Sequence, residues 1–212
     1  MGGSRQRRIG EIERYVAALS AEDRMRFDRL FSVTSVLGRL VPPPTMRDWI
    51  SKQFGSVDAV ATQRIVKATN LVTHEGSLFN ELRSKRPMDA GEPHALREMV
   101  DQSRGDPFCH PERWTPADVF GRVRGRHGIT ASNVAKYDGF HGLVIFDEHD
   151  PLRFGESEVV DYVDLALEWG RRAHELDPEA RYFFFMWNCL WKAGASILHG
   201  HAQMSLGRGM HY

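Results

Sequence analysis

The 212-residue sequence predicts an α+β protein, with an antiparallel sheet, one helix packed on it, and a helical extension at the N-terminus. Three observations support this prediction. Apolar residues recur at helical spacing early in the chain, short segments rich in β-branched and aromatic residues dominate its last part, and a long amphipathic pattern separates these segments. Because strand segments lie on both sides of one helix, the pattern favours the α+β class.

Residues 1–74 make up the predicted helical extension. From Ile12 to Leu40 apolar residues recur at helical spacing among many charges, until "VPPPT" removes the backbone donors that a helix needs. Ser56 is placed to cap a further helix over "VDAVATQRIVKATNLV". We expect these helices either to cover an edge of the sheet or to mediate dimerisation.

Residues 75–212 make up the second predicted domain. Strands are expected near Gly128–Ser132 and Leu143–Asp147, joined by a glycine-containing turn, which favours an antiparallel pair. The clearest helix, Glu156–Leu176, has its small and apolar residues on one side and acidic residues in its first turn. Two more strands, "RYFFFMWN" and "SILHGHAQMSL", are joined by the turn "CLWKAGA".

Composition excludes several classes of partner. Lys plus Arg and Asp plus Glu each total 28, so no bulk electrostatic attraction to nucleic acid or acidic lipid is expected. No apolar segment follows the basic start, and no stretch approaches the roughly 18 apolar residues of a membrane span. The only cysteines are Cys109 and Cys189, which fits a reducing compartment. We therefore expect a soluble, cytoplasmic protein without a nucleic-acid or membrane partner.

The stretch "AGASILHGHAQM" carries the chemistry of the chain. On an extended strand His199, His201 and Gln203 share one face, each about 6.5–7 Å from the next, while small and apolar residues face the core. Each of the three alone fits a structural role equally well. Together with the turn at residues 194–196 they bring backbone N–H groups, a hydroxyl, two imidazoles and an amide onto one hairpin, which suits phosphate binding. A neutral imidazole can also attack phosphorus.

The segment "NCLWKAGASILHGHAQ" resembles the active-site segment of the galactose-1-phosphate uridylyltransferase branch of the histidine triad (HIT-like) superfamily. That branch also holds diadenosine polyphosphate phosphorylases, and its signature is His-X-His-X-Gln, where the hydrolase branch has a third histidine. The motifs "LRSKRP", "DPFC" and "HGLVIFDEHDP" precede it in the expected order, so the resemblance covers about Glu75–Gln203. It implies that residues 75–212 form a HIT-like nucleotidyltransferase domain.

The resemblance implies a role for each site residue. His201 would be the nucleophile that carries a nucleoside monophosphate, with its other ring nitrogen held by an acceptor such as a backbone carbonyl. Gln203 would donate to a phosphate oxygen. The implied substrate and phosphate contacts are Arg83, Arg86, Asn133, Asn188, Gly194, Ala195 and Ser196.

Two of these contacts have plain alternatives when the resemblance is set aside. Taken alone, the cluster of Arg83, Lys85 and Arg86 fits a solvated run of surface charge better than a binding site. Asn188 reads equally as a residue that caps a turn.

The resemblance also implies a structural zinc ion. Its ligands would be Asp106, Cys109, His149 and His199, with aspartate in the place of the family's first cysteine. These four are acceptable zinc ligands and make a closed tetrahedral set, whereas His110 offers a competing ligand. Without zinc, Cys109 would be a buried thiol and His199 a positioning residue.

The implied reaction transfers a nucleoside monophosphate of the UMP type between a nucleoside diphosphate sugar and a sugar 1-phosphate, through nucleotidyl-His201. Three alternatives stay open: phosphorolysis of a dinucleoside polyphosphate, nucleotide hydrolysis, and a non-catalytic nucleotide- or zinc-binding module. Gln203 argues against the hydrolase. In the transferases a second, similar half contributes to the acceptor site, so we expect either one half of a two-repeat protein or a chain that completes its site as a homodimer.

Overall fold

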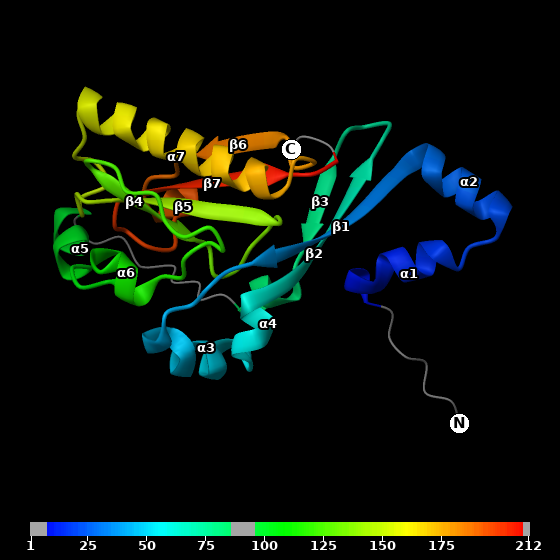
Figure 1. The fold of residues 1–212 in the computed structure, drawn as a ribbon, viewed down its shortest axis with the longest axis horizontal. Helices are drawn as coiled ribbons and strands as arrows, with labels where there is room; N and C mark the ends of the chain where they lie inside the picture. The colour runs from blue at the N-terminus through cyan, green and yellow to red at the C-terminus, as the bar shows by residue number, and fades with distance from the viewer. Residues whose placement is uncertain (1–7, 86–95, 210–212) are drawn as a thin grey trace.

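The computed structural model describes residues 8–85 and 96–209, which form two antiparallel sheets (Figure 1). The first has the strand order β1-β2-β3, and its strands are β1 (Phe31–Arg39), β2 (Thr62–Asn70) and β3 (Gly76–Phe79). The second has the order β4-β5-β7-β6, and its strands are β4 (Gly128–Ser132), β5 (Phe140–Phe146), β6 (Tyr182–Met186) and β7 (His201–Gly207). The predicted α+β class is confirmed.

Short helices connect the strands. The α-helices are α1 (Ile12–Ala17), α2 (Ala21–Leu30), α3 (Arg47–Phe54), α4 (Val57–Ala61), α5 (Leu96–Gln102), α6 (Pro111–Trp114) and α7 (Glu156–Leu176). The 3-10 helices are η1 (Ile9–Glu11), η2 (Pro44–Met46), η3 (Glu81–Lys85), η4 (Pro107–Cys109) and η5 (Trp191–Ala193). Within the described ranges, no helix is both long and apolar enough to cross a membrane.

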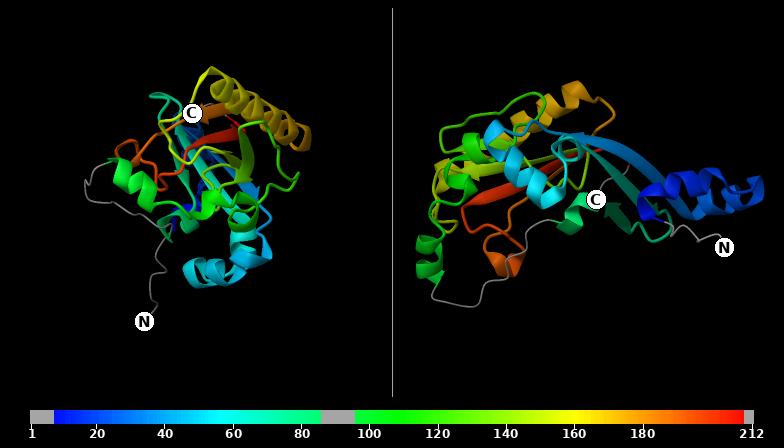
Figure 2. Two further views of the ribbon diagram at one scale, coloured as in Figure 1. Left: turned by 90° about the vertical axis from the view of Figure 1, so that its left-hand side faces the viewer. Right: turned by 90° about the horizontal axis from the view of Figure 1, so that it is seen from below.

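Helix α7 covers one face of the four-stranded sheet (Figures 1 and 2). Its predicted bounds are those of the structure, but only part of the predicted apolar side is buried: Ala166, Gly170 and Ala173 are, whereas Val163 and Leu167 are exposed. Tyr162 and Trp169 complete the buried face instead. Trp169 lies directly over Gly142 of β5, where a Cβ atom would come within 2.8 Å of the indole. The glycine therefore lets the helix approach the sheet closely.

The opposite face of this sheet carries the catalytic candidates. His201 and Gln203 of β7 pair with Ile145 and Leu143 of β5, so all four side chains project from the same face. Phe108 of η4 packs on the apolar residues there. The site is therefore covered by a loop rather than open along its whole length.

The strand that holds His201 is shorter than predicted. It begins at His201, so the prediction that His199 lies in the same strand is wrong. The Gly200 N–H donates to the His149 carbonyl at 3.1 Å, and the Gly200 carbonyl accepts from Phe146 N–H at 2.9 Å. A Cβ atom at Gly200 would also lie 2.6 Å from the Phe146 ring. Residues 199 and 200 therefore bend against the loop after β5. His199 does not continue the strand face formed by His201 and Gln203.

The prediction of a mostly helical segment over residues 1–74 is wrong for β1 and β2. These strands pair along nine residues each, from Phe31 opposite Asn70 to Arg39 opposite Thr62. The apolar residues keep helical spacing only as far as Phe31, whose ring lies 5.4 Å from that of Phe27. The β-branched residues that follow, Val33, Thr34 and Val36, favour a strand.

The predicted helix capped by Ser56 is present but shorter than expected. Ser56 caps a helix, since its hydroxyl accepts from the Ala59 N–H at 3.2 Å, but that helix ends at Ala61. The predicted domain boundary at residue 74 falls in the turn between β2 and β3, which pair with each other.

Buried polar side chains tie the two sheets together. The Gln63 amide of β2 donates to the Val134 carbonyl at 2.8 Å and accepts from the Lys136 N–H at 3.2 Å. Lys136 is fully buried, and its ammonium donates to the Ser132 hydroxyl at 2.6 Å and the His141 carbonyl at 2.9 Å. The N-terminal sheet therefore fixes the segment between β4 and β5.

Replacing Lys136 by methionine should lower the free energy of unfolding by about 3–5 kcal/mol, because the buried Asp118 carboxylate, 3.6 Å from the ammonium, would lose its cation. Urea unfolding followed by tryptophan fluorescence measures the loss. The matched double variant Lys136→Met/Asp118→Asn should recover part of it, because no uncompensated charge is then buried. A loss below about 1 kcal/mol in the single variant would contradict this account of the pair.

Candidate functional site

Four predicted metal ligands converge beside the four-stranded sheet. Asp106 and Cys109 come from η4, His149 from the loop after β5, and His199 from the bend before β7. One ligand atom from each residue lies within 4.8 Å of all the others. Cys109 Sγ is 3.4 Å from His149 Nδ1 and 3.5 Å from His199 Nδ1. The group could therefore hold a metal ion.

Hydrogen bonds orient both imidazoles toward the centre of this group. His149 Nε2 lies 2.9 Å from the Val100 carbonyl and 3.0 Å from the Ser103 hydroxyl, and His199 Nε2 lies 2.8 Å from the Phe146 carbonyl. Because a carbonyl only accepts, each Nε2 bears a hydrogen and each Nδ1 presents a lone pair. The two Nδ1 atoms are 3.0 Å apart, a distance at which facing lone pairs repel unless a proton or a metal ion lies between them.

Asp106 completes the group. Its Oδ1 accepts from the N–H groups of Phe108 and Cys109 at 2.8 and 3.2 Å and lies 3.6 Å from His199 Nδ1. Its Oδ2 is buried with no hydrogen-bond partner in the described part of the chain. A metal ion would supply that partner. His110, the competing ligand considered above, is exposed and lies outside the group.

His201 is buried and fixed in one tautomer. Its side chain is 8% exposed, and its Nδ1 lies 2.8 Å from the His199 carbonyl, so Nδ1 bears the hydrogen and Nε2 has the free lone pair. The Phe108 ring lies edge-on at 5.1 Å between centroids. Burial lowers the pKa of His201, which favours the neutral imidazole. A neutral ring with a free Nε2 can act as a nucleophile.

Gln203 lies two residues after His201 on β7, so the two side chains project from the same face of the sheet. Its Oε1 lies 3.0 Å from Nε2 of His141, a fully buried histidine of β5. Burial, reinforced by the nearby Lys136 ammonium, holds the pKa of His141 well below its usual range. The Gln203 amide is therefore held by a neutral imidazole from the neighbouring strand.

Two of the predicted substrate contacts meet at the segment between β4 and β5. Arg83 of η3 donates to the Ala135 carbonyl at 2.9 Å, and its guanidinium lies 5.5 Å from the centre of the Tyr137 ring. The Asn133 side chain accepts from the Ala135 N–H at 3.0 Å. The structure thus brings Arg83 and Asn133 together at the segment just before β5, the strand that carries His141. Arg86 lies outside the described residues.

The predicted phosphate turn uses some of its donors internally. Gly194, at a φ of 91°, donates its N–H to the Trp191 carbonyl at 2.9 Å, and Ala195 donates to the Leu190 carbonyl at 3.2 Å. The Ser196 side chain is exposed. None of the hydrogen bonds between described residues joins this turn to His201 or Gln203.

The same turn forms one side of a pocket of about 330 Å³ beside the metal-ligand group. Its lining comes from α5, η4 and the stretch after β6, and consists of Met99, Ser103, Asp106, Pro107, Trp191, Ala195, Ser196, Ile197 and Leu198. Asn188 is half-buried between β6 and η5 and does not line this pocket.

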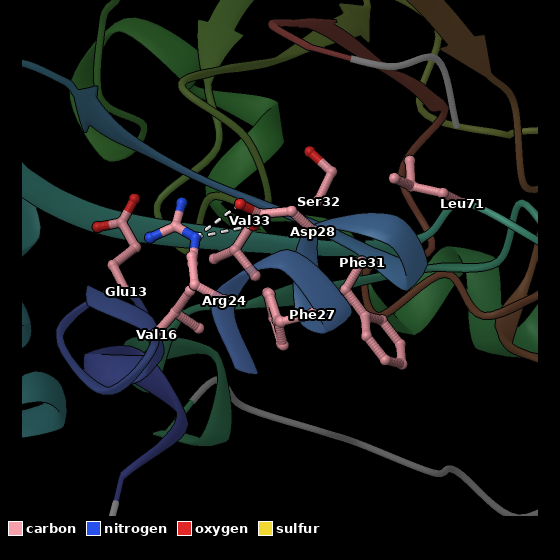
Figure 3. Close-up of a pocket in the computed structure, with 9 residues that line it drawn as sticks. All are labelled: Glu13, Val16, Arg24, Phe27, Asp28, Phe31, Ser32, Val33 and Leu71. Atoms are coloured by element: carbon pink, nitrogen blue, oxygen red, sulfur yellow. Dashed lines mark hydrogen bonds and ion pairs between the residues drawn. The ribbon is translucent and has the colours of Figure 1, made fainter. Parts of the chain in front are cut away.

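A larger pocket, of about 530 Å³, lies between α1, α2 and β1 (Figure 3). Arg24 Nε lies 2.7 Å from Asp28 Oδ2 inside it, Glu13 pairs with Arg64 outside it, and Phe27 and Phe31 supply its apolar side. No predicted site residue lines it. The pocket therefore lies among the N-terminal helices and β1, away from the four-stranded sheet.

Sequence reasoning missed His141, Lys136 and Tyr137. The signal for His141 was present: it alternates with Leu143 and Ile145 in "FHGLVIF", which places a histidine on the same face as the catalytic candidates. Nothing in the sequence indicated that Lys136 would be buried, because Gln63 and Asp118, which contact it, come from distant segments of the chain.

The chain is therefore a mixed protein of antiparallel sheets and helices, with a group of one Asp, one Cys and two buried His residues beside one sheet. No protein-family model matches the chain, and no curated protein matches it.

Solved structures with similarity to the chain include two proteins described as HIT family members. A HIT family protein from Bacillus anthracis aligns at 17% identity and a TM-score of 0.37, covering 41% of this chain and 62% of its own. A HIT family hydrolase from Clostridium thermocellum aligns at 20% identity and a TM-score of 0.37, and the alignment covers 49% of this chain and 88% of the hydrolase.

An ADP-glucose phosphorylase from Arabidopsis thaliana, with bound ADP-glucose, aligns at 19% identity and a TM-score of 0.35, covering 62% of this chain and 45% of that one. The alignments thus span less than two thirds of the Bacillus anthracis chain and less than half of the Arabidopsis chain. Alignments of this size carry no argument about the reaction, which has to come from the chain's own residues.

Proposed function

We propose that this protein transfers a nucleoside monophosphate between phosphate compounds through a covalent intermediate on His201 Nε2. The observation that carries the proposal is the 2.8 Å contact between His201 Nδ1 and the His199 carbonyl. It fixes the tautomer in which Nε2 is unprotonated, on a ring that burial keeps neutral. A structural histidine does not need this combination.

The reaction proceeds in two displacements at phosphorus. The His201 Nε2 lone pair attacks the α-phosphorus of the donor, a P–N bond forms, and the bond to the bridging oxygen breaks, which releases a phosphorylated leaving group. An oxygen of the acceptor phosphate then attacks the same phosphorus and the P–N bond breaks. An acceptor phosphate is already anionic, so neither displacement requires a base to remove a proton.

The remaining residues favour transfer over hydrolysis. Water is a poor acceptor unless a base takes its proton, and the Gln203 amide does not titrate. We assign a nucleoside diphosphate sugar as the donor, a UMP-type group as the one transferred and a sugar 1-phosphate as the acceptor. Arg83 contacts the segment between β4 and β5 through the Ala135 carbonyl, and its guanidinium would attract the donor's diphosphate.

We further propose that Asp106, Cys109, His149 and His199 hold a structural zinc ion. The donor set of one carboxylate, one thiolate and two Nδ1 atoms suits tetrahedral zinc, and the carbonyl contacts at both Nε2 atoms are the usual support for such ligands. When bound, the ion joins η4 to the bend before β7. His199 then positions His201, because its carbonyl holds the His201 ring.

A panel of donors and acceptors tests the proposal. The protein is incubated with UDP-glucose, ADP-glucose or diadenosine tetraphosphate, each with galactose 1-phosphate, inorganic phosphate or no acceptor, and products are separated by chromatography. We expect a new nucleotide only when an acceptor phosphate is present, with ping-pong initial-rate kinetics. Release of nucleoside monophosphate at the same rate without an acceptor would indicate a hydrolase, and no reaction with any donor would indicate a binding module.

A further inference from the structure

We propose that His141 is a positioning residue that sets the orientation of the Gln203 amide, so that the amide NH2 group, and not its oxygen, faces the phosphate carried by His201. The inference rests on the proposed function for its consequence, but the hydrogen-bond arrangement that it describes is a property of the protein alone.

The tautomer of His141 follows from its backbone neighbour. The Tyr137 N–H donates to His141 Nδ1 at 3.2 Å, and a backbone N–H has no other role than donor. Nδ1 is therefore the unprotonated nitrogen, and in the neutral ring Nε2 bears the hydrogen. The atom 3.0 Å from that Nε2 is the oxygen Oε1 of Gln203, which accepts.

Only one orientation of the Gln203 amide satisfies this contact. The other amide near His141 Nε2 is that of Asn133, whose nitrogen lies 3.3 Å away and whose oxygen already accepts from Ala135 N–H. Gln203 Oε1 is thus the acceptor for the imidazole hydrogen. The Gln203 amide nitrogen makes no hydrogen bond within the part of the chain that the structure describes, so both of its hydrogens remain for a ligand.

The surroundings keep His141 in this state. It is fully buried, its ring centroid lies 3.7 Å from that of Tyr137, and its own carbonyl accepts from the buried Lys136 ammonium. A second ring proton on Nδ1 would face the Tyr137 N–H, so protonation is disfavoured by geometry as well as by burial. The ring therefore acts as a fixed donor.

The orientation matters because the two ends of an amide have opposite polarity. An NH2 group facing a phosphate oxygen donates to it, whereas the flipped amide places oxygen against oxygen, which is repulsive. Without His141, rotation about the last side-chain torsion of Gln203 would populate both orientations. His141 thus acts through Gln203 and needs no contact with the substrate.

A double-mutant cycle tests the role in transfer. His141→Leu removes the donor, Gln203→Ala removes the amide, and each is expected to lower the rate of nucleotidyl transfer about 10- to 100-fold with little change in donor KM. The double variant should lose no more than Gln203→Ala alone, because His141 acts only through that amide. His141→Gln, which places an amide N–H near the position of Nε2, should recover most of the rate.

Multiplication of the two losses in the double variant, or an unchanged rate in His141→Leu, would overturn the proposal. Thermal melting of every variant shows whether a loss of rate reflects a loss of fold. Recovery of the rate in His141→Gln would show that the loss in His141→Leu comes from the missing hydrogen-bond donor and not from unfolding.

An NMR measurement decides the arrangement independently of activity. In protein labelled with ¹⁵N-histidine, the ring shifts and one-bond couplings of His141 report which nitrogen bears the hydrogen. We expect hydrogen on Nε2 and none on Nδ1. Hydrogen on Nδ1 would overturn the inference even in an active enzyme, while an inactive wild type with hydrogen on Nε2 would contradict the proposed function and leave the arrangement intact.

Discussion

Replacing His201 by asparagine is expected to lower nucleotidyl transfer by at least about 10⁴-fold while the protein stays folded. Asparagine can keep a donor near the position of Nδ1, and so the 2.8 Å contact with the His199 carbonyl, but it has no lone pair where Nε2 lies. The loss should therefore fall on the chemical step, and binding of the donor should remain.

The measurement is the single-turnover rate at saturating donor, with donor affinity from isothermal titration. His110→Asn is the matched control, because His110 is exposed and lies outside the metal-ligand group. It should react at the wild-type rate. A His201→Asn variant that keeps more than about a tenth of the wild-type rate would exclude His201 as the nucleophile.

Replacing Cys109 by alanine is expected to remove the bound zinc and to lower the Tm by about 10 °C. A metal that binds only the folded protein, at about a thousand times its Kd, stabilises it by about 4 kcal/mol, and each kcal/mol shifts Tm by about 2–4 °C in a chain of this length. The two Nδ1 atoms that face each other at 3.0 Å would also lose their shared cation.

Elemental analysis of protein purified without chelator, together with thermal melting, checks this expectation. Wild type should hold about one zinc per chain, and Cys109→Ala far less. Cys189→Ala is the control, since that thiol lies outside the group and its Sγ lies 3.7 Å from the Pro151 carbonyl. A wild-type protein that melts at the same temperature with and without chelator would contradict a structural metal.

Much of the four-stranded sheet and its helix could be predicted from the sequence because their signals are local. The helix over Glu156–Leu176 has a long apolar period, and the strand Gly128–Ser132 has β-branched residues between turns. The four candidate metal ligands were named from the resemblance to ordered motifs and do lie together, although no local pattern brings residues 106, 149 and 199 together.

The parts that sequence reasoning missed depend on contacts between distant segments. Strand β1 follows α2 without a turn residue, and its pairing with β2 comes from residues about thirty positions later. The bend at Gly200 arises from contact with Phe146, and the burial of Lys136 arises from Gln63 and Asp118. Such effects have no signal within a short window of sequence.

The covalent step on His201 is tested most directly by mass spectrometry of the trapped intermediate. Wild-type protein is mixed with UDP-glucose without an acceptor, quenched in alkaline denaturant to preserve an acid-labile P–N bond, digested, and analysed by tandem fragmentation. We predict one uridine monophosphate on His201 that is lost when galactose 1-phosphate is added before the quench. Turnover of UDP-glucose with no adduct, or with the adduct on another residue, would contradict nucleophilic catalysis by His201.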